Sequence, residues 1–386
     1  MLRRTMISAV TGSPTQTTDR TLALIAGASV AVSLSAVLAR FAGVMPDGPS
    51  TLIVIVGAAI GLKVAFTYAS RSASDATRTR VMKRVSTIGL AISVLTVIAS
   101  LPRITKAGGV HVFLLDFFAQ LWTLALLWIV AGPVRTIGWR AFVGAWLTGF
   151  LGLTALARLV GTPIVDKLGV SSLLGTALWV PITEELIKLL PVILVLVLAM
   201  RRPRARPSVL DVVVLAASTG AGFNIYESAT FGRGAFSLSA NPVLSLFIPG
   251  LPKASAYGWP LVQSGHLAHT ALIALGVAFA LMYPKQFARR WIVPTVAIAA
   301  VLIEHCSQNA IVTGKLNEIV GKFSMVLTLG GRLTTLMLMG GVGYVAMLEW
   351  RAVGREFYPD TWFRLLVAEA ARRSSQLAQA QMRGSI

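Results

Sequence analysis

Residues 183–191 read Thr-Glu-Glu-Leu-Ile-Lys-Leu-Leu-Pro and lie within an apolar run from about Val170 to Met200. That run is long enough to cross a bilayer. A charged side chain near the membrane centre costs roughly 2.5–3.5 kcal/mol on insertion scales, so such groups usually face a protein interior and mark function. Successive helical residues turn by about 100°, which places Lys188 within one turn of both Glu184 and Glu185. One lysine can therefore contact two acids, and one carboxylate is left to accept a proton.

The composition is that of a membrane protein. Hydrophobic residues make up 55% of the chain and charged residues only 13%, with a formal net charge of +20. Because the lysines and arginines cluster in short loops between apolar runs, the positive charge indicates membrane topology and not nucleic-acid binding. The single cysteine, Cys306, excludes an internal disulfide, and no metal-type cysteine spacing is present.

We predict an all-α, polytopic membrane bundle of about ten transmembrane helices. The predicted spans are 21–42, 51–70, 85–101, 112–134, 139–161, 172–200, 209–231, 260–283, 291–312 and 323–348. The heaviest basic loops follow even-numbered spans, so the positive-inside rule places these loops and both termini in the cytoplasm. The chain divides into a cytoplasmic N-terminus (1–20), a five-helix membrane scaffold (21–161), a catalytic transmembrane core (162–350) and a cytoplasmic C-terminal tail (351–386).

Polar residues in four consecutive predicted spans fall at a similar depth. Counted from the span ends, all of them lie in the outer half of the membrane. Helices that run in opposite directions would not align such residues by chance, so we expect one polar pocket below the outer leaflet. Its residues are Glu184 and Glu185, then Glu227, then His266 and His269, and last His305 and Asn309.

Other residues near this pocket have structural explanations. Gly220 and Gly222 would allow helices to approach closely. Pro181 lies just before the acidic pair and can loosen the local backbone bonding. Glu304 faces a different side of its helix from His305 and could pair with Gln308. Arg332, deep in the tenth predicted span, is a candidate counter-ion for the acids.

These residues resemble the motif set of the PrsW family of intramembrane glutamic-type proteases. That family is related to the CAAX-processing prenyl endopeptidases and the bacteriocin-processing membrane proteases. The resemblance covers about residues 162–314. The matching motifs are Glu-Glu with a basic residue three positions on (Glu184, Glu185, Lys188), an aromatic with Glu four positions on (Phe223, Glu227), His with Gly seven positions on (His269, Gly276), and His with Asn four positions on (His305, Asn309).

The resemblance implies an intramembrane endopeptidase in the cell membrane, where it would be a multi-pass protein. Its substrate would be a single-pass, membrane-anchored protein, such as an anti-sigma-factor-like protein, cut near the extracytoplasmic face. Glu184 would activate a water, Glu185 would orient it or share its proton, and Lys188 would tune both acids. The remaining implied site residues are His269 to align the water or protonate the leaving amine, His305 and Asn309 to stabilise the oxyanion, Glu227 as the acid of the second motif, and Phe223 and His266 in support.

For this protease we expect no cofactor. A metal-dependent membrane hydrolase is the main alternative, with zinc held by Glu184, His269 and His305, although the chain has no His-Glu-x-x-His signature. Intramembrane acids and histidines also line ion pathways, so a proton- or ion-coupled transporter is a second alternative. A non-catalytic membrane receptor is a third. The predicted partners are the lipid bilayer and the single-pass protein substrate, with no nucleic acid.

Overall fold

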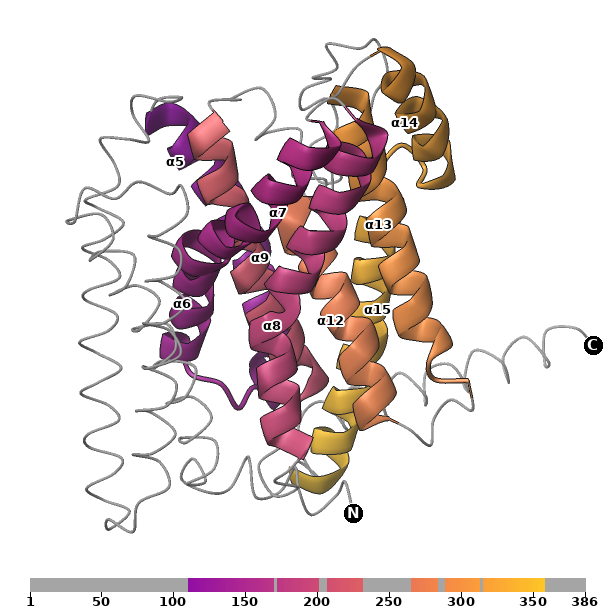
Figure 1. The fold of residues 1–386 in the computed structure, drawn as a ribbon. Helices are drawn as coiled ribbons and strands as arrows, with labels where there is room; N and C mark the ends of the chain where they lie inside the picture. The colour runs from indigo at the N-terminus through magenta and orange to yellow at the C-terminus, as the bar shows by residue number, and fades with distance from the viewer. Residues whose placement is uncertain are drawn as a thin grey trace, which may run out of the picture.

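The computed structural model describes residues 110–169, 172–200, 207–231, 265–283, 289–312 and 315–357, and all regular structure in these ranges is helical (Figure 1). The prediction of an all-α fold is therefore confirmed for these ranges. Two segments, η2 and η3, are π-helical, and η1 is a 3₁₀ turn. The elements are α5 (Val110–Ala131), η1 (Gly132–Val134), α6 (Trp139–Leu147), η2 (Thr148–Leu153), α7 (Thr154–Leu168), η3 (Leu173–Trp179), α8 (Val180–Met200), α9 (Val209–Phe231), α12 (Gly265–Met282), α13 (Ile292–Val312), α14 (Lys315–Leu327) and α15 (Leu333–Phe357).

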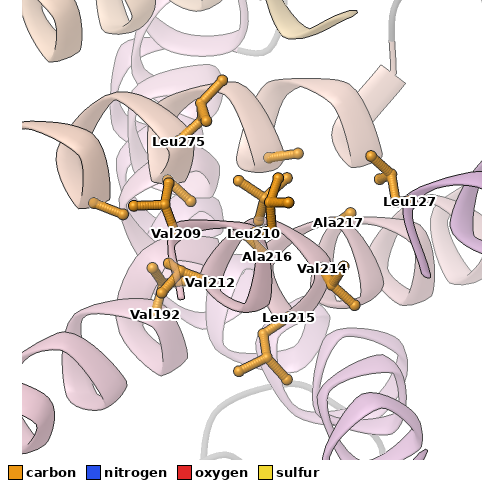
Figure 2. Packing of buried hydrophobic residues seen from close by; sticks show 14 of the residues in the cluster. Leu127, Val192, Val209, Leu210, Val212, Val214, Leu215, Ala216, Ala217 and Leu275 are labelled. Carbon is orange, nitrogen blue, oxygen red and sulfur yellow. The ribbon is translucent and has the colours of Figure 1, made fainter. Parts of the chain in front are cut away.

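Helix α9 is the centre of the described bundle. Of its apolar span Val209–Glu227, 94% is buried, against 39% of the span Leu333–Ala352 in α15. It packs against α5, α6, α8 and α12, and Figure 2 shows its side chains between Leu275 of α12 and Val192 of α8. A helix enclosed in this way can be apolar nearly all round, which is what the sequence of α9 shows.

Glycines set how closely α9 approaches its neighbours. A Cβ atom at Gly220 would overlap the backbone of His266 in α12, and one at Gly222 would overlap the backbone of Trp146 in α6. Membrane helices associate through such close contacts, because lipid provides no hydrophobic force between them. The predicted role of both glycines is confirmed, and Gly220 brings the first turn of α12 against α9.

Helix α8 has one apolar, exposed side and one polar, buried side. Leu186, Leu190 and Ile193 are 60%, 47% and 46% exposed, and their spacing puts them along one stripe of the helix. Glu185 and Lys188 are 2% and 0% exposed and point into the bundle. The charges therefore lie inside the protein, while the exposed stripe is suited to contact with lipid.

The predicted spans agree with the helices over much of the described chain. Spans 172–200, 209–231 and 291–312 match η3 with α8, α9 and α13 within one residue at either end. Within the described ranges three helices are long and apolar enough to cross a membrane, namely Val209–Glu227, Gly265–Met282 and Leu333–Ala352. Spans 21–42, 51–70 and 85–101, the N-terminus 1–20 and the chain after residue 357 lie outside the described residues. The count of ten helices and the cytoplasmic termini stay predictions.

The predicted tenth span, 323–348, is wrong as one helix. Helix α14 ends at Leu327 and α15 begins at Leu333. Between them Leu329, Gly330 and Gly331 have φ angles of 54°, 67° and 87°, and a right-handed helix cannot continue through such a turn. Arg332 lies in this turn and donates to the carbonyl of Leu329 at 3.4 Å. The expectation that it is a counter-ion for the acids is therefore wrong in the described structure.

Candidate active site

The side chains that the sequence places at one depth come together from four helices. Each predicted site residue lies on its expected helix, and all but Asn309 join one connected cluster of polar contacts or pack against it. The cluster comprises Glu184, Glu185 and Lys188 of α8, Phe223 and Glu227 of α9, His266 and His269 of α12, and His305 of α13. The spatial meeting predicted from depth is therefore confirmed.

Glu185 is the hub of this cluster. Its Oε1 atom lies 2.8 Å from Nζ of Lys188 and 2.9 Å from Nδ1 of His305. The same oxygen lies 3.6 Å from Nδ1 of His266 and 3.7 Å from Nδ1 of His269. With 2% exposure, this carboxylate is compensated by close donors from two helices, Lys188 of α8 and His305 of α13. Its second oxygen, Oε2, is buried and has no hydrogen-bond partner.

Glu184 lies beside the hub with looser contacts. Its Oε2 atom is 3.6 Å from Nε2 of His305, 3.8 Å from Nζ of Lys188 and 3.9 Å from Nε2 of His266. That oxygen is buried and lacks a hydrogen-bond partner. The side chain as a whole is 13% exposed, against 3% for that of Glu185. Lys188 contacts both acids, as predicted from their spacing, but it is hydrogen-bonded only to Glu185 of the two.

Both nitrogens of His266 are engaged. Nε2 contacts Oε2 of Glu227 at 2.5 Å, and Nδ1 contacts the ammonium of Lys188. Gly265, with a φ angle of 73°, starts α12 just before this residue, and the His266 amide donates to Oδ1 of Asn224 at 3.4 Å. The Asn224 contact was not predicted. Because the Glu227 side chain is 33% exposed, this pair forms the most accessible side of the cluster.

Phe223 forms an aromatic wall behind these charges. Its ring centroid lies 4.5 Å from Nζ of Lys188 and 5.0 Å from the ring centroid of His266, which it meets edge-on. A cation over the face of an aromatic ring is attracted to it, more so where water is excluded. The aromatic residue of the second motif therefore holds the lysine and the histidine in place.

His269 is held from the far side by a glutamate that sequence reasoning did not assign to the site. Its Nε2 atom lies 3.1 Å from Oε1 of Glu304. The predicted pair of Glu304 with Gln308 is present at 3.3 Å, and the hydroxyl of Thr334 donates to the other oxygen. An acid inside an apolar span was a usable signal for Glu304. Thr334 follows the unpredicted turn and had no such signal.

The sequence comparison adds the family. Residues 127–331 match the family model described as PrsW family intramembrane metalloprotease. The chain belongs to this family. No curated protein and no solved structure matches it significantly. The predicted resemblance to the PrsW family is confirmed, and with it the assignment as a membrane protease.

In this PrsW-family chain Asn309 makes a different contact from its predicted one. In η3 the amide of Val180 donates to the carbonyl of Gly175, five residues earlier. The same pattern would pair the Thr176 carbonyl with residue 181, which is proline and has no amide hydrogen. Nδ2 of Asn309 donates to that carbonyl at 3.1 Å. Asn309 thus joins α13 to the segment leading into the acidic pair, and its oxyanion role stays a prediction.

The cluster also contains two groups of side chains that could hold a metal ion. In each group the ligand atoms lie within 4.8 Å of one another. The first is Glu185 with His266, His269 and His305, and the second is Glu184 with Glu227 and His266. The structure therefore places Glu185, and not Glu184, with His269 and His305. Together with the family description, this fits the zinc alternative better than the expectation of no cofactor.

The donor atoms of the first group are suited to a divalent cation. Oε2 of Glu185 and Nδ1 of His269 are buried without hydrogen-bond partners, and mixed imidazole and carboxylate ligands are typical of zinc enzymes. Acids also outnumber permanent cations among the described residues of the centre, with Glu184, Glu185, Glu227 and Glu304 facing Lys188 as the permanent cation. Protonated histidines or a bound cation would balance this charge.

Proposed function

We propose that this protein is a multi-pass intramembrane endopeptidase of the cell membrane that cuts a single-pass membrane protein near the extracytoplasmic face. An anti-sigma-factor-like protein is the proposed class of substrate. The observation that carries the proposal is the pairing of two adjacent acids in different environments: Oε1 of Glu185 is held by Lys188 and His305, whereas the contacts of Glu184 are longer and its side chain is more exposed, and each acid keeps one buried oxygen without a hydrogen-bond partner. A centre that only stabilised the fold would gain by satisfying both.

Glu184 is the better candidate for the general base. A base must accept a proton from water, which needs an oxygen that other donors do not already occupy. Oε1 of Glu185 is occupied by Lys188 and His305. Oε2 is without a hydrogen-bond partner in both acids, but the Glu184 side chain is 13% exposed against 3% for Glu185, so water reaches Glu184 more readily. Glu185 and Lys188 then set the field around the base, as a fixed pair of opposite charges.

The histidines orient and stabilise the groups that take part in peptide hydrolysis. His266 lies between Glu184, at 3.9 Å, and the partly exposed Glu227, to which it is hydrogen-bonded. Because Lys188 and Glu227 already engage both nitrogens of His266, this ring orients the acids, and the proton taken by Glu184 passes from Glu184 itself to the leaving amine. Nε2 of His305 lies 3.6 Å from Oε2 of Glu184. Because Nδ1 already donates to Glu185, the imidazolium form would donate from Nε2 to the developing oxyanion when no metal is bound.

A zinc ion would be held by Glu185, His269 and His305. These residues offer one carboxylate and two imidazoles, which is a ligand set of catalytic zinc sites that keep one position open. Bound there, the ion would act as a Lewis acid on the scissile carbonyl. His266 is less suited as a ligand, because Glu227 and Lys188 already contact its two nitrogens. Glu184 stays outside the ligand set and remains the base.

The proposed side of cleavage follows from the topology. The basic segment after α8 contains Arg201, Arg202, Arg204 and Arg206, and the segment after α12 contains Lys285, Arg289 and Arg290. The positive-inside rule puts both segments in the cytoplasm. Glu184 lies near the beginning of α8 and His266 near the beginning of α12, each far from the basic end of its helix. The centre is therefore proposed to lie in the outer half of the membrane.

Quantitative proteomics of cell membranes tests this function. Membranes that express the wild-type protein should release an extracytoplasmic fragment of a single-pass protein, and membranes that express Glu184→Gln should not. Metal analysis of the purified protein tests the zinc ligands, with about one zinc per chain expected in the wild type and a loss of zinc expected in His269→Ala. A fragment that is released equally by both proteins would contradict the proposed function. Zinc-free protein that still cleaves would contradict the metal assignment alone.

A further inference from the structure

Glu304 is a fully buried acid next to the centre, at 0% exposure, in the middle of α13. Burying a carboxylate is costly unless its oxygens accept several hydrogen bonds. Replacement by an apolar residue would usually be neutral or stabilising if the acid served packing alone. The position of this acid therefore calls for an explanation in terms of its partners.

Three side chains from three helices contact the two oxygens of Glu304. Nε2 of His269 in α12 lies 3.1 Å from Oε1, and Nε2 of Gln308 in α13 donates to the same oxygen at 3.3 Å. The hydroxyl of Thr334 in α15 donates to Oε2. Thr334 lies in the first turn of α15, directly after the turn at residues 328–332. His269 and Thr334 are both 0% exposed, so water does not compete for these bonds.

These contacts decide which nitrogen of His269 carries a proton. A neutral imidazole has one N–H donor and one lone-pair nitrogen. A carboxylate oxygen at Nε2 accepts a hydrogen bond and repels a lone pair, so the proton belongs on Nε2. The lone pair is then on Nδ1, which is buried without a hydrogen-bond partner. Oε1 of Glu185 lies 3.7 Å from Nδ1, beyond hydrogen-bonding distance, so the closer contact with Glu304 at 3.1 Å decides the position of the proton. The reversed tautomer would place a lone pair against the carboxylate of Glu304.

We propose that Glu304 is a positioning residue, which acts through His269 and holds it in the tautomer that presents the Nδ1 lone pair to the Glu185 side of the centre. Thr334 and Gln308 fix the carboxylate so that its Oε1 faces the imidazole. Partners of this kind orient a histidine that serves as a base or as a metal ligand. The catalytic consequence rests on the proposed function, whereas the tautomer itself does not.

Nuclear magnetic resonance of the ring nitrogens reads the tautomer directly. The chain has 4 histidines, so protein labelled with ¹⁵N-histidine gives few ring signals, and those of His269 are identified by their absence in His269→Gln. We expect a protonated Nε2 and an unprotonated Nδ1 in the wild-type protein. A protonated Nδ1 would overturn the proposal. This reading needs no variant of Glu304 to fold and no cleavage assay, so it can fail or succeed independently of the protease function.

Substitutions at Glu304 test whether this residue fixes the tautomer of His269 and how that affects activity. Glu304→Gln keeps an oxygen for His269, because its amide can donate to Thr334, whose hydroxyl can accept instead. Glu304→Ala removes the acceptor. We expect the alanine variant to lose the single tautomer and about 10- to 100-fold in release of the substrate fragment, and the glutamine variant to keep the tautomer and most of the activity. Equal losses in the two variants, or an unchanged tautomer in Glu304→Ala, would overturn the proposal.

Glu349→Gln is the matched control for these variants. Glu349 is also a buried acid, at 1% exposure, but it bonds to the backbone amides of Val209 and Leu210. We expect this variant to leave the His269 tautomer and the release of fragment unchanged. If Glu349→Gln alters the tautomer as Glu304→Ala does, the effect reflects general loosening of the bundle, and the assignment of Glu304 is overturned.

Discussion

Two groups of buried acids lie in the described bundle, and their partners differ in kind. The group around Glu185, which we call the Glu185 cluster and propose as the active site, pairs its acids with lysine and histidine side chains, which can exchange protons. The second group, which we call the Asp211–Glu349 cluster, pairs its acids with backbone amides and a hydroxyl from the start of α9 and from the segment before α6. Asp211 accepts from the backbone and hydroxyl of Thr136 and from the amide of Ser208, and Glu349 accepts from two amides at the start of α9.

The difference shows that burial of an acid does not by itself indicate catalysis. Asp211 and Glu349 are as buried as Glu185, at 0%, 1% and 2% exposure. Backbone amides do not titrate. At the start of a helix they would otherwise lack acceptors, and these acids supply them. In the Glu185 cluster Glu184, Glu185 and His269 each keep one buried atom without a hydrogen-bond partner. Unsatisfied atoms beside proton-exchanging partners are what distinguish the proposed active site.

Glu185→Ala should have the largest effect, because it removes the hub of the Glu185 cluster. Lys188 and His305 both lose their close acceptor. We expect release of the substrate fragment to fall by more than about 100-fold, and the stability to fall by about 3–5 kcal/mol, as for other broken buried ion pairs. Fragment release and the denaturation midpoint of the purified protein measure these effects. A variant with wild-type stability would contradict the role of Glu185 as the hub.

Asn309→Ala should have an intermediate effect that falls mainly on activity. It leaves the Thr176 carbonyl without its side-chain donor and releases α13 from the segment before the acids. We expect roughly 1 kcal/mol of lost stability and a loss of about 10- to 100-fold in fragment release from misplaced groups. Introducing Pro181→Ala into this variant restores an amide that can pair with Thr176. If the double variant recovers no activity, the structural role of Asn309 is contradicted.

Asp211→Asn should have a smaller effect, and on stability alone. An amide at this position keeps some of the hydrogen bonds to Thr136 and Ser208, but one of the two acceptor oxygens of Asp211 is lost. We expect about 1–3 kcal/mol of lost stability, measured by thermal unfolding, with fragment release per folded molecule unchanged. A selective loss of activity at normal stability would show that the Asp211–Glu349 cluster also takes part in the reaction. It would contradict the functional difference between the two clusters.

The sequence predicted the helices better than the contacts of the site. The span 209–231 agrees with α9 because this helix is apolar over most of its length and follows a basic, proline-rich segment. The pair Gly330–Gly331 signals a turn, yet hydropathy carried the predicted span across it. A depth argument placed the acids and histidines together, since it needs only helix direction and rise.

The contacts depended on information that periodicity does not contain. Glu304 was judged to face away from the site because it points about 100° from His305, but His269 lies on that side. The acceptor for Asn309 depends on a missing amide at Pro181, which the sequence does contain, and on a π-helical segment, which it does not reveal. Thr334 reaches the site only because α14 and α15 are separate helices.

The most direct test of the account compares Glu184→Gln with Glu349→Gln in the same membranes. Each substitution replaces one buried carboxyl group by an amide of the same shape, one in each cluster. Release of the substrate fragment is measured by quantitative mass spectrometry and divided by the amount of folded protein. We predict a loss of about 10²- to 10⁴-fold for Glu184→Gln and none for Glu349→Gln. Equal activity in the two variants would contradict the assignment of the Glu185 cluster, to which Glu184 belongs, as the hydrolytic centre.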